Sequence, residues 1–159
     1  MINRIPSALS SREDAALRRW SKDRRVVEAG ALLGHSTVEI GRVARSLISI
    51  DRHTGYDNQP NDTLRQYMRN LEVAFLNIAV LAIVGDAVTE LPKYSADFVF
   101  IDLCGTHAVT LAAIQAARAP FVGVHDFQRQ NCKGVGSAIE ACGFPVIERT
   151  DSLVILRKA

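Results

Sequence analysis

The chain of 159 residues has only three cysteines, and no two of them form a C-x-x-C pattern. An odd, widely spaced set argues against a disulfide framework, so we expect free thiols and a reducing compartment. Long apolar runs are also lacking, because the longest, VAFLNIAVLAIVG, is interrupted by Asn77 and is too short to span a bilayer. The first residues contain no apolar segment of the signal-peptide kind. These absences predict a cytoplasmic protein with no membrane partner.

Charge of one sign is equally scarce. The 19 Lys and Arg residues against 17 Asp and Glu residues give a formal net charge of +2. Nucleic-acid-binding domains usually carry a marked basic excess, so we expect no nucleic-acid partner. The local basic run within residues 18–25 is typical of a solvated helix end.

Helix and strand patterns alternate along most of the chain. Strand patterns cover residues 25–30, 47–51, 80–87, 97–103, 120–127, 144–149 and 152–158. This alternation predicts an α/β fold: a doubly wound, mostly parallel seven-stranded Rossmann-like sheet with a C-terminal antiparallel hairpin across Thr150-Asp151. We expect one domain over residues 1–159, with residues 1–23 as an N-terminal helical extension. Ser10 and Glu13 have the spacing of a capping box at the start of its helix. A short chain with a bare sheet edge is also compatible with a homodimer.

Ligands of doubly wound sheets bind beyond the carboxyl ends of the strands. After the first strand, Gly30 and Gly34 allow a tight turn, and Ser36 and Thr37 open a helix whose free N–H groups attract a negative group. Asp51 ends the second strand, 21 positions after Gly30, near the offset of an acid that binds a ribose diol. The ends of the later strand patterns carry further candidates: Gly85, Asp86, Asp102, His125 and Asp126. Their agreement predicts a nucleotide-cofactor site.

The turn itself distinguishes two cofactors. A dinucleotide fingerprint has glycine at the middle of the turn, because the pyrophosphate presses against the backbone there. In this chain Leu32 occupies that position. S-adenosylmethionine carries no phosphate, and Glu28 suits its amino group. The turn therefore favours S-adenosylmethionine, and an NAD(P)-dependent oxidoreductase is a less favoured alternative.

The segment VVEAGALLGHSTVEIG resembles motif I of the class I S-adenosylmethionine-dependent methyltransferases, in the branch whose turn reads E-x-G-x-x-x-G-x-S-T. The segments IDRHTGYDNQPNDTLRQYMRNLE, VGDAVTELP, ADFVFIDLCGTH and GVHDF are similar to later motifs of that small-molecule O-methyltransferase-like branch. The resemblance covers about residues 24–159. It implies transfer of a methyl group to an oxygen of a small molecule or sugar.

The resemblance also assigns residues. The implied cofactor contacts are Glu28, Gly30, Gly34, Ser36 and Thr37 for the methionine part, Asp51 for the ribose, Arg52, Asp86 and Ala87 for the adenine, and Asp102 for the sulfonium. A hydroxyl acceptor needs a base or a metal. The catalytic candidates are accordingly His125 and His107 as bases, with Asp102 favouring the cationic donor, and Mg²⁺ on Asp102 and Asp126 is a further implied cofactor.

One segment departs from this pattern. After the fourth strand the family commonly reads F-I-D-G-D-H-S-Y, whereas this chain reads FIDLCGTH, so Asp102 remains but the second acid does not. This departure and the short chain leave a second hypothesis: a non-catalytic binding or structural protein on a methyltransferase fold.

Overall fold

A computed structural model describes residues 5–55, 63–74, 76 and 78–158 of the chain. Its α-helices are α1 Ser11–Ser21, α2 His35–Gly41, α3 Leu64–Val73, α4 Ala87–Glu90, α5 His107–Ala116 and α6 Lys133–Ala141. Two 3₁₀ helices are η1 Leu91–Lys93 and η2 Gln130–Cys132. Its strands are β1 Arg25–Ala29, β2 Ser46–Asp51, β3 Val80–Val84, β4 Phe98–Ile101, β5 Phe121–Val124, β6 Val146–Thr150 and β7 Leu153–Arg157.

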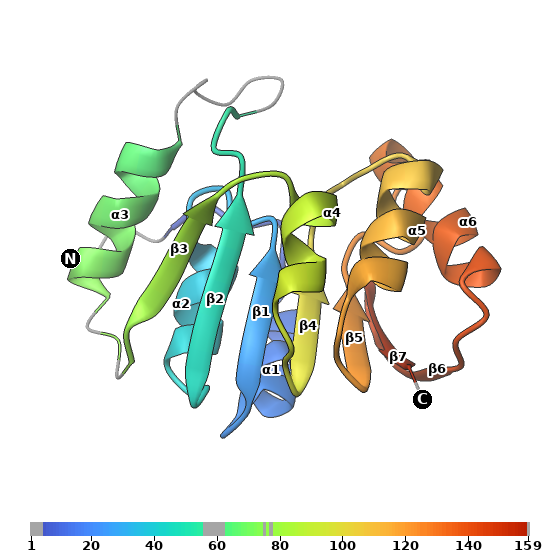
Figure 1. The fold of residues 1–159 in the computed structure, drawn as a ribbon, viewed down its shortest axis with the longest axis horizontal. Helices are drawn as coiled ribbons and strands as arrows, with labels where there is room; N and C mark the ends of the chain where they lie inside the picture. Colours follow the sequence, from blue (N-terminus) through green and yellow to red (C-terminus); the bar gives the residue numbers. More distant parts are fainter. Residues whose placement is uncertain (1–4, 56–62, 75, 77, 159) are drawn as a thin grey trace.

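The strands form one sheet in the order β3-β2-β1-β4-β5-β7-β6 (Figure 1). The pairs among β1 to β5 are parallel, whereas β7 is antiparallel to both β5 and β6. The chain winds outward from β1 to β3 and then returns to the other side of β1 with β4. The predicted doubly wound sheet with a closing hairpin is therefore confirmed, and its switch point lies between β1 and β4.

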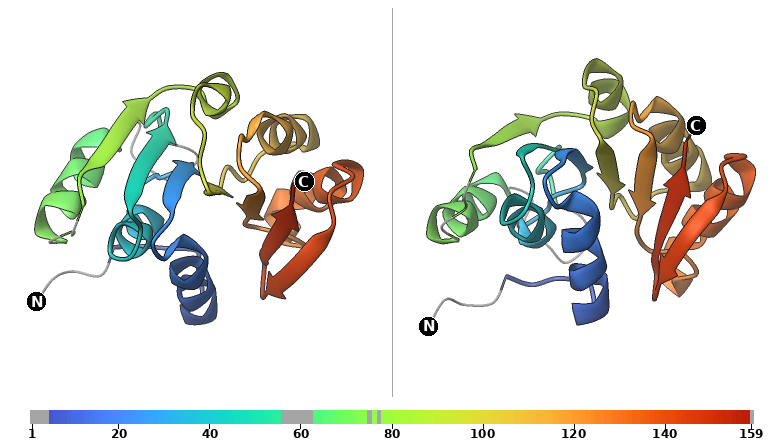
Figure 2. Two further views of the ribbon diagram at one scale, coloured as in Figure 1. Left: turned by 60° about the horizontal axis from the view of Figure 1, so that its bottom comes forward. Right: turned by 90° about the horizontal axis from the view of Figure 1, so that it is seen from below.

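Helices cover both faces of the sheet, as a parallel sheet requires. Figure 2 shows α1, α2 and α3 on one face and α4, α5 and α6 on the other. Successive strand residues point to opposite faces, so Val26 and Phe98 join Leu17 of α1 in one core, whereas Val27 and Val99 join the other. All four residues of β4 are buried, which agrees with its unbroken apolar sequence.

Two local predictions meet different outcomes. The capping box is confirmed, because Ser10 Oγ accepts a hydrogen bond from the Glu13 N–H and the Glu13 carboxylate accepts one from the Ser10 N–H. The predicted position of the hairpin connection, Thr150-Asp151, was wrong by one residue. Strand β6 continues through Thr150, and the turn is Asp151-Ser152. Asp151 has a φ of 51°, which Asp tolerates better than the β-branched Thr150 does.

No helix within the described ranges is long and apolar enough to cross a membrane. Strands β3 and β6 form the two outer edges of the sheet. On β3, Leu81 and Val84 are 55% and 59% exposed. The homodimer predicted from a bare edge stays a prediction.

Candidate functional site

The parallel strands end level with one another at one edge of the sheet, in the direction of the arrowheads in Figure 1. Ala29 of β1 pairs with Ile50 of β2 and with Ile101 of β4, and Ile101 pairs with Val124 of β5. The residues that follow these strand ends therefore gather at one rim. The acids that stand at or just beyond these ends are Asp51, Asp86, Asp102 and Asp126.

Asp51 closes the turn that follows β1. Its Oδ2 accepts hydrogen bonds from the backbone N–H groups of Ala31 and Leu32, both at 2.8 Å, and Oδ1 accepts one from the His53 N–H at 2.6 Å. The side chain is 18% exposed. An ionised carboxylate has about four acceptor positions, so three internal bonds leave capacity for a further donor. The structure thus brings the predicted ribose-binding acid to the glycine turn.

Gly30 and Gly34 allow that turn to pack closely on its neighbours. Their φ angles are +95° and +89°, in the region that side chains rarely adopt. A Cβ on Gly30 would lie 2.0 Å from the carbonyl oxygen of Asp102, and one on Gly34 would lie 3.0 Å from Cδ2 of Tyr67. The two glycines therefore hold the turn against the end of β4 and against α3.

We expect Gly30→Ala to lower the free energy of unfolding by more than about 2 kcal/mol, because a positive φ and a backbone clash add. Gly143→Ala is the matched control, since Gly143 also has a positive φ, +76°, but a Cβ added there would have no atom within 4 Å. That control should lose only about 1–2 kcal/mol. Urea unfolding measures both, and equal losses would contradict the close packing of Gly30 on β4.

Glu28 lies beneath the turn and is fully buried. Its carboxylate accepts hydrogen bonds from the hydroxyls of Ser36, Thr37 and Ser49, which join β1 to α2 and β2. Burial raises the pKa of Glu28 to about 7 despite these three donors. The structure therefore brings three of the predicted methionine-binding residues together, but Ser36 and Thr37 direct their hydroxyls to Glu28 inside the protein.

Arg52 and Asp86, both predicted to lie beside an adenine, form an ion pair across the ends of β2 and β3. Asp86 also accepts the Thr89 N–H at 3.0 Å and so caps α4, whose first residue is the buried Ala87. The Thr89 bond and the Arg52 guanidinium lower the pKa of Asp86. The Arg52 and Asp86 side chains are 67% and 36% exposed, and exposed pairs are weak. This pair can therefore open at little cost.

Asp102, His125 and Glu13 form a chain of groups that leads from the rim into the protein. His125 Nδ1 lies 3.0 Å from Asp102 Oδ1, and His125 Nε2 lies 3.6 Å from Glu13 Oε1. Asp102 is 23% exposed, whereas the side chains of His125 and Glu13 are 0% and 1% exposed. The predicted base His125 is thus covered. Of the three side chains, that of Asp102 is the one that reaches solvent.

Sequence reasoning missed Glu13, because its capping-box spacing already explained it. In the structure its second carboxylate oxygen accepts the N–H and the hydroxyl of Ser152, at 2.8 and 2.7 Å, and faces His125. Burial by itself lowers the pKa of His125, but the bond to Asp102 and the charges of three nearby carboxylates outweigh it and raise that pKa. The imidazole is therefore held toward its charged form between Asp102 and Glu13.

The predicted Mg²⁺ pair, Asp102 and Asp126, faces cationic groups that the protein itself supplies. Asp126 Oδ1 lies 3.3 Å from His125 Nδ1 and 3.2 Å from Arg129 Nε, and Asp102 contacts the same imidazole. Mg²⁺ requires near-octahedral oxygen ligands, and the next residue, Phe127, offers no side-chain oxygen. The residues present do not fit Mg²⁺.

His107, the other predicted base, is the first residue of α5 and is exposed. Its Nδ1 lies 2.9 Å from the hydroxyl of Ser137 on α6. The structure therefore brings His107 to the neighbouring helix, whereas the ring that meets Asp102 is that of His125.

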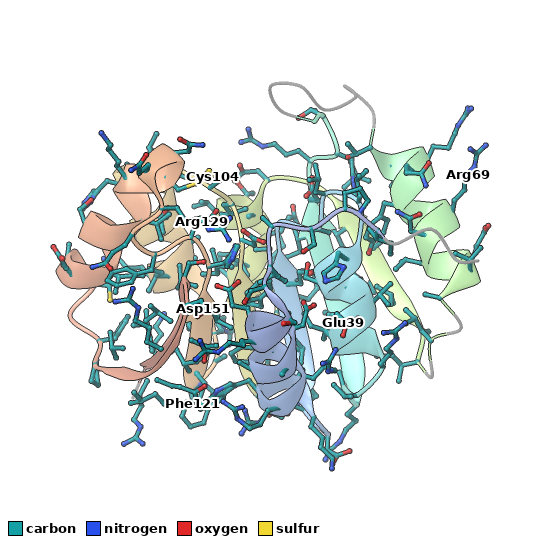
Figure 3. The ribbon with its side chains drawn as sticks, turned by 180° about the vertical axis from the view of Figure 1, so that it is seen from behind. Glu39, Arg69, Cys104, Phe121, Arg129 and Asp151 are labelled. Carbon is teal, nitrogen blue, oxygen red and sulfur yellow. A yellow bond between two sulfur atoms is a disulfide. The ribbon has the colours of Figure 1, made fainter. Side chains whose placement is uncertain are left out.

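Cys104 and Cys132 form a disulfide with their Cα atoms 5.3 Å apart, so the prediction of free thiols was wrong for this pair. Cys104 follows β4 and Cys132 ends the segment after β5; these strands are neighbours, which brings the two cysteines together across 28 positions. Cys142 is free and buried. Cysteine usage therefore no longer argues for a reducing compartment. Figure 3 labels Cys104 at the end of the molecule where the parallel strands finish.

No protein-family model matches the chain, and no curated protein matches it in sequence. Solved structures do resemble it. CalS11, a TDP-rhamnose 3'-O-methyltransferase of calicheamicin biosynthesis, has a TM-score of 0.66 at 18% identity, over 91% of this chain and 76% of that one. The O-methyltransferase TomG from Streptomyces achromogenes, in complex with SAM, has 0.64 at 16%, over 96% and 82%. Precorrin 8W decarboxylase of Methanobacterium thermoautotrophicum has 0.68 at 16%, over 98% and 94%.

Each of these likenesses extends over at least 91% of the chain. Two of the three proteins are named as methyltransferases and one as a decarboxylase, so they share an architecture rather than a single reaction. The chain has the Rossmann-like fold of the class I S-adenosylmethionine-dependent methyltransferases.

Proposed function

We propose that the chain is an S-adenosylmethionine-dependent methyltransferase that acts on an oxygen of a small molecule or sugar. The observation that carries this proposal is the position of Asp51, whose carboxylate meets the glycine turn at the same rim as Asp102. Two neighbours of the same fold are named as O-methyltransferases, and one of them is a complex with SAM, which supports the choice of cofactor and acceptor atom.

The rim residues suit the parts of this cofactor. Asp51 keeps acceptor capacity for ribose hydroxyls, and the turn that begins at Gly30 offers backbone groups to the methionine part. Arg52, Asp86 and Ala87 are the proposed adenine contacts. Asp102 keeps one carboxylate oxygen that makes no hydrogen bond among the described residues, and an anion beside a sulfonium favours the charged donor. When bound, S-adenosylmethionine supplies an electrophilic methyl group.

Three predicted contacts take a supporting role in this proposal. The hydroxyls of Ser36 and Thr37 both donate hydrogen bonds to Glu28 below the turn. A buried, hydrogen-bonded set fixes the backbone above it, because each member has its partners in place. These side chains therefore position the turn, while the backbone of the turn contacts the cofactor.

Asp102 is the proposed catalytic group for the acceptor. Its outward oxygen would accept a hydrogen bond from the acceptor hydroxyl. It would take the proton as that hydroxyl oxygen gains the methyl group that the sulfonium gives up, which leaves S-adenosylhomocysteine, and the proton would then pass to solvent. His125 and Glu13 are positioning residues, because their side chains are buried. The His125 ring contacts the inner carboxylate oxygen of Asp102 and so fixes the orientation of that side chain. His107 stays a second candidate base, since its ring lies on an exposed surface next to Ser137.

Calorimetric titration with S-adenosylmethionine, S-adenosylhomocysteine and NAD(H) tests the cofactor. We expect both sulfur compounds to bind and Asp51→Asn to weaken them at least about 10-fold, because hydrogen bonds to a charged group contribute about 1.5–3 kcal/mol. Asp97→Asn is the matched control: Asp97 pairs with Arg25 next to the start of β4, away from the rim. Equal affinities of Asp51→Asn and wild type, with both proteins folded, would contradict the proposed ribose contact.

A non-catalytic binding protein is the second candidate. The observation that favours it is internal bonding: Asp51 accepts three backbone N–H groups, and Arg52 pairs with Asp86. Binding of the sulfur compounds without methyl transfer to any of a broad set of hydroxylated acceptors would support this candidate. A preference for NAD(H) would instead support the oxidoreductase.

A further inference from the structure

A second set of ligand groups lies beside the rim, and methyl transfer does not use it. The set, which we call the sulfur cluster, consists of Cys104, Cys132 and Asp126. One ligand atom from each residue lies within 4.8 Å of the other two. The residues come from the segment after β4 and from the segment after β5, which the disulfide joins.

Asp126 Oδ2 points at this disulfide. It lies 3.3 Å from Cys132 Sγ, and Asp126 as a whole is 5% exposed. A disulfide sulfur carries no hydrogen, so this contact is not a hydrogen bond while the disulfide is closed. Oδ1 of the same carboxylate faces His125 and Arg129. Oδ2 is therefore a buried carboxyl oxygen with no hydrogen-bond donor in the described part of the chain, and such an oxygen requires a cation or a donor.

We propose that the reduced sulfur cluster binds one Zn²⁺ through the Cys104 and Cys132 thiolates and Asp126 Oδ2. Zn–S distances of about 2.3 Å and Zn–O distances of about 2.0–2.2 Å place tetrahedral S and O ligands about 3.5 Å apart and two S ligands about 3.8 Å apart. The observed separation of Cys132 Sγ and Asp126 Oδ2, 3.3 Å, is close to the first value. After reduction the two sulfur atoms separate to the S–S distance of a zinc site, and water takes the fourth position.

The identity of the ion follows from the ligand types. Thiolates are soft ligands that favour Zn²⁺ over Mg²⁺, whereas the Asp102–Asp126 pair considered above offers only hard oxygens. The thiolate, not the disulfide, is the metal ligand, so the site exists only after reduction. Two equivalents of an external thiol supply two electrons and two protons to the Cys104–Cys132 bond and become a disulfide; the two cysteines then release their protons when Zn²⁺ binds.

Either form links the loop after β4 to the segment after β5. The disulfide does so by one covalent bond, and Zn²⁺ does so by three coordinate bonds that also engage Asp126. Asp102 stands two positions before Cys104, so both forms restrain the loop that carries it. The zinc site does not depend on the proposed methyl transfer, because none of its three ligands contacts the cofactor in that proposal.

The test uses the full chain, reduced with excess dithiothreitol, freed of reductant without oxygen, and titrated with Zn²⁺ in competition with a chromophoric chelator. We expect one Zn²⁺ per reduced chain and none per oxidised chain. Co²⁺ in place of Zn²⁺ should give a thiolate-to-cobalt charge-transfer band. The substitutions Cys104→Ser, Cys132→Ser and Asp126→Asn should each weaken binding at least about 10- to 100-fold, since even outer-shell changes have effects of that size.

Cys142→Ser is the matched control, because Cys142 is a buried free thiol outside the cluster, and it should bind Zn²⁺ like the wild type. Alkylation of the native wild type checks the ligands without any substitution: bound Zn²⁺ should protect Cys104 and Cys132, as mass spectrometry shows. Failure of the reduced wild type to bind stoichiometric Zn²⁺ would overturn the proposal. Unchanged affinity in folded Asp126→Asn, or in either cysteine variant, would also overturn it.

Discussion

We expect Asp102→Asn to lower kcat for methyl transfer by about 10²–10⁴-fold, the range typical of a lost general acid or base. The amide has nearly the shape of the carboxylate but cannot take a proton from the acceptor hydroxyl. It also removes the negative charge that favours a sulfonium, so affinity for S-adenosylmethionine should fall more than affinity for neutral S-adenosylhomocysteine. Turnover is measured on an acceptor identified by screening hydroxylated small molecules and sugars with labelled donor.

Two variants separate catalysis from positioning. Asp97→Asn makes the same chemical change at the opposite end of β4 and should keep wild-type turnover. Glu13→Gln keeps an oxygen for Ser152 but removes the charge that faces His125, and it should lower kcat less than Asp102→Asn does, with KM for the acceptor unchanged. Full activity in Asp102→Asn would contradict the catalytic role of this residue.

We expect the free energy of unfolding to fall by about 3 kcal/mol between pH 4.5 and pH 8 through Glu28 alone. Burial raises the pKa of Glu28 from its ordinary value of 4.5 to about 7, so the folded state holds this proton more tightly than the unfolded state does. The contribution is therefore fully present below pH 4.5 and is lost as the pH rises through 7. Each pKa unit corresponds to about 1.4 kcal/mol, which gives the stated size.

Glu28→Gln tests this expectation, because the amide has no charge to acquire. Its free energy of unfolding, from urea titrations at several pH values, should lack the decline that the wild type shows. Glu140→Gln, an exposed position on α6, should decline in parallel with the wild type. Parallel curves for Glu28→Gln and the wild type would show that Glu28 does not titrate in this range. Tyr67 and Asp102, whose charges interact with that of Glu28, are unchanged in both variants.

Much of the fold could be predicted from local patterns. The buried run that became β4 and the alternation of strands with helices are properties of short segments, so they are visible without knowledge of the packing. Prediction was poorer at the hairpin, because a single residue with positive φ, Asp151, decides where the turn lies. The position of Asp51 near the Gly30 turn could also be predicted from their offset in sequence, since a βαβ unit has a nearly constant length.

The chemistry of the site was less predictable. Asp51 was placed correctly at the turn, but the partners of Glu28 and of Arg52 were not foreseen. Residue types show what a side chain can bond to, whereas distances decide what it does bond to. His125 was a reasonable base by its pKa, yet its complete burial gives it a positioning role in the proposed mechanism.

By itself, the sequence determined the segments, their order and the side of the sheet at which acids and glycines collect, because these depend on periodicity and on the handedness of βαβ connections. Only the tertiary structure decided that Cys104 meets Cys132 and that Glu13 faces His125. It also decided that Asp102, which contacts His125, is the member of this group that reaches solvent. Those contacts join residues 28, 112 and 23 positions apart. A local sequence pattern cannot predict such long-range contacts, since they depend on β4 lying next to β5 and on α1 packing against the sheet.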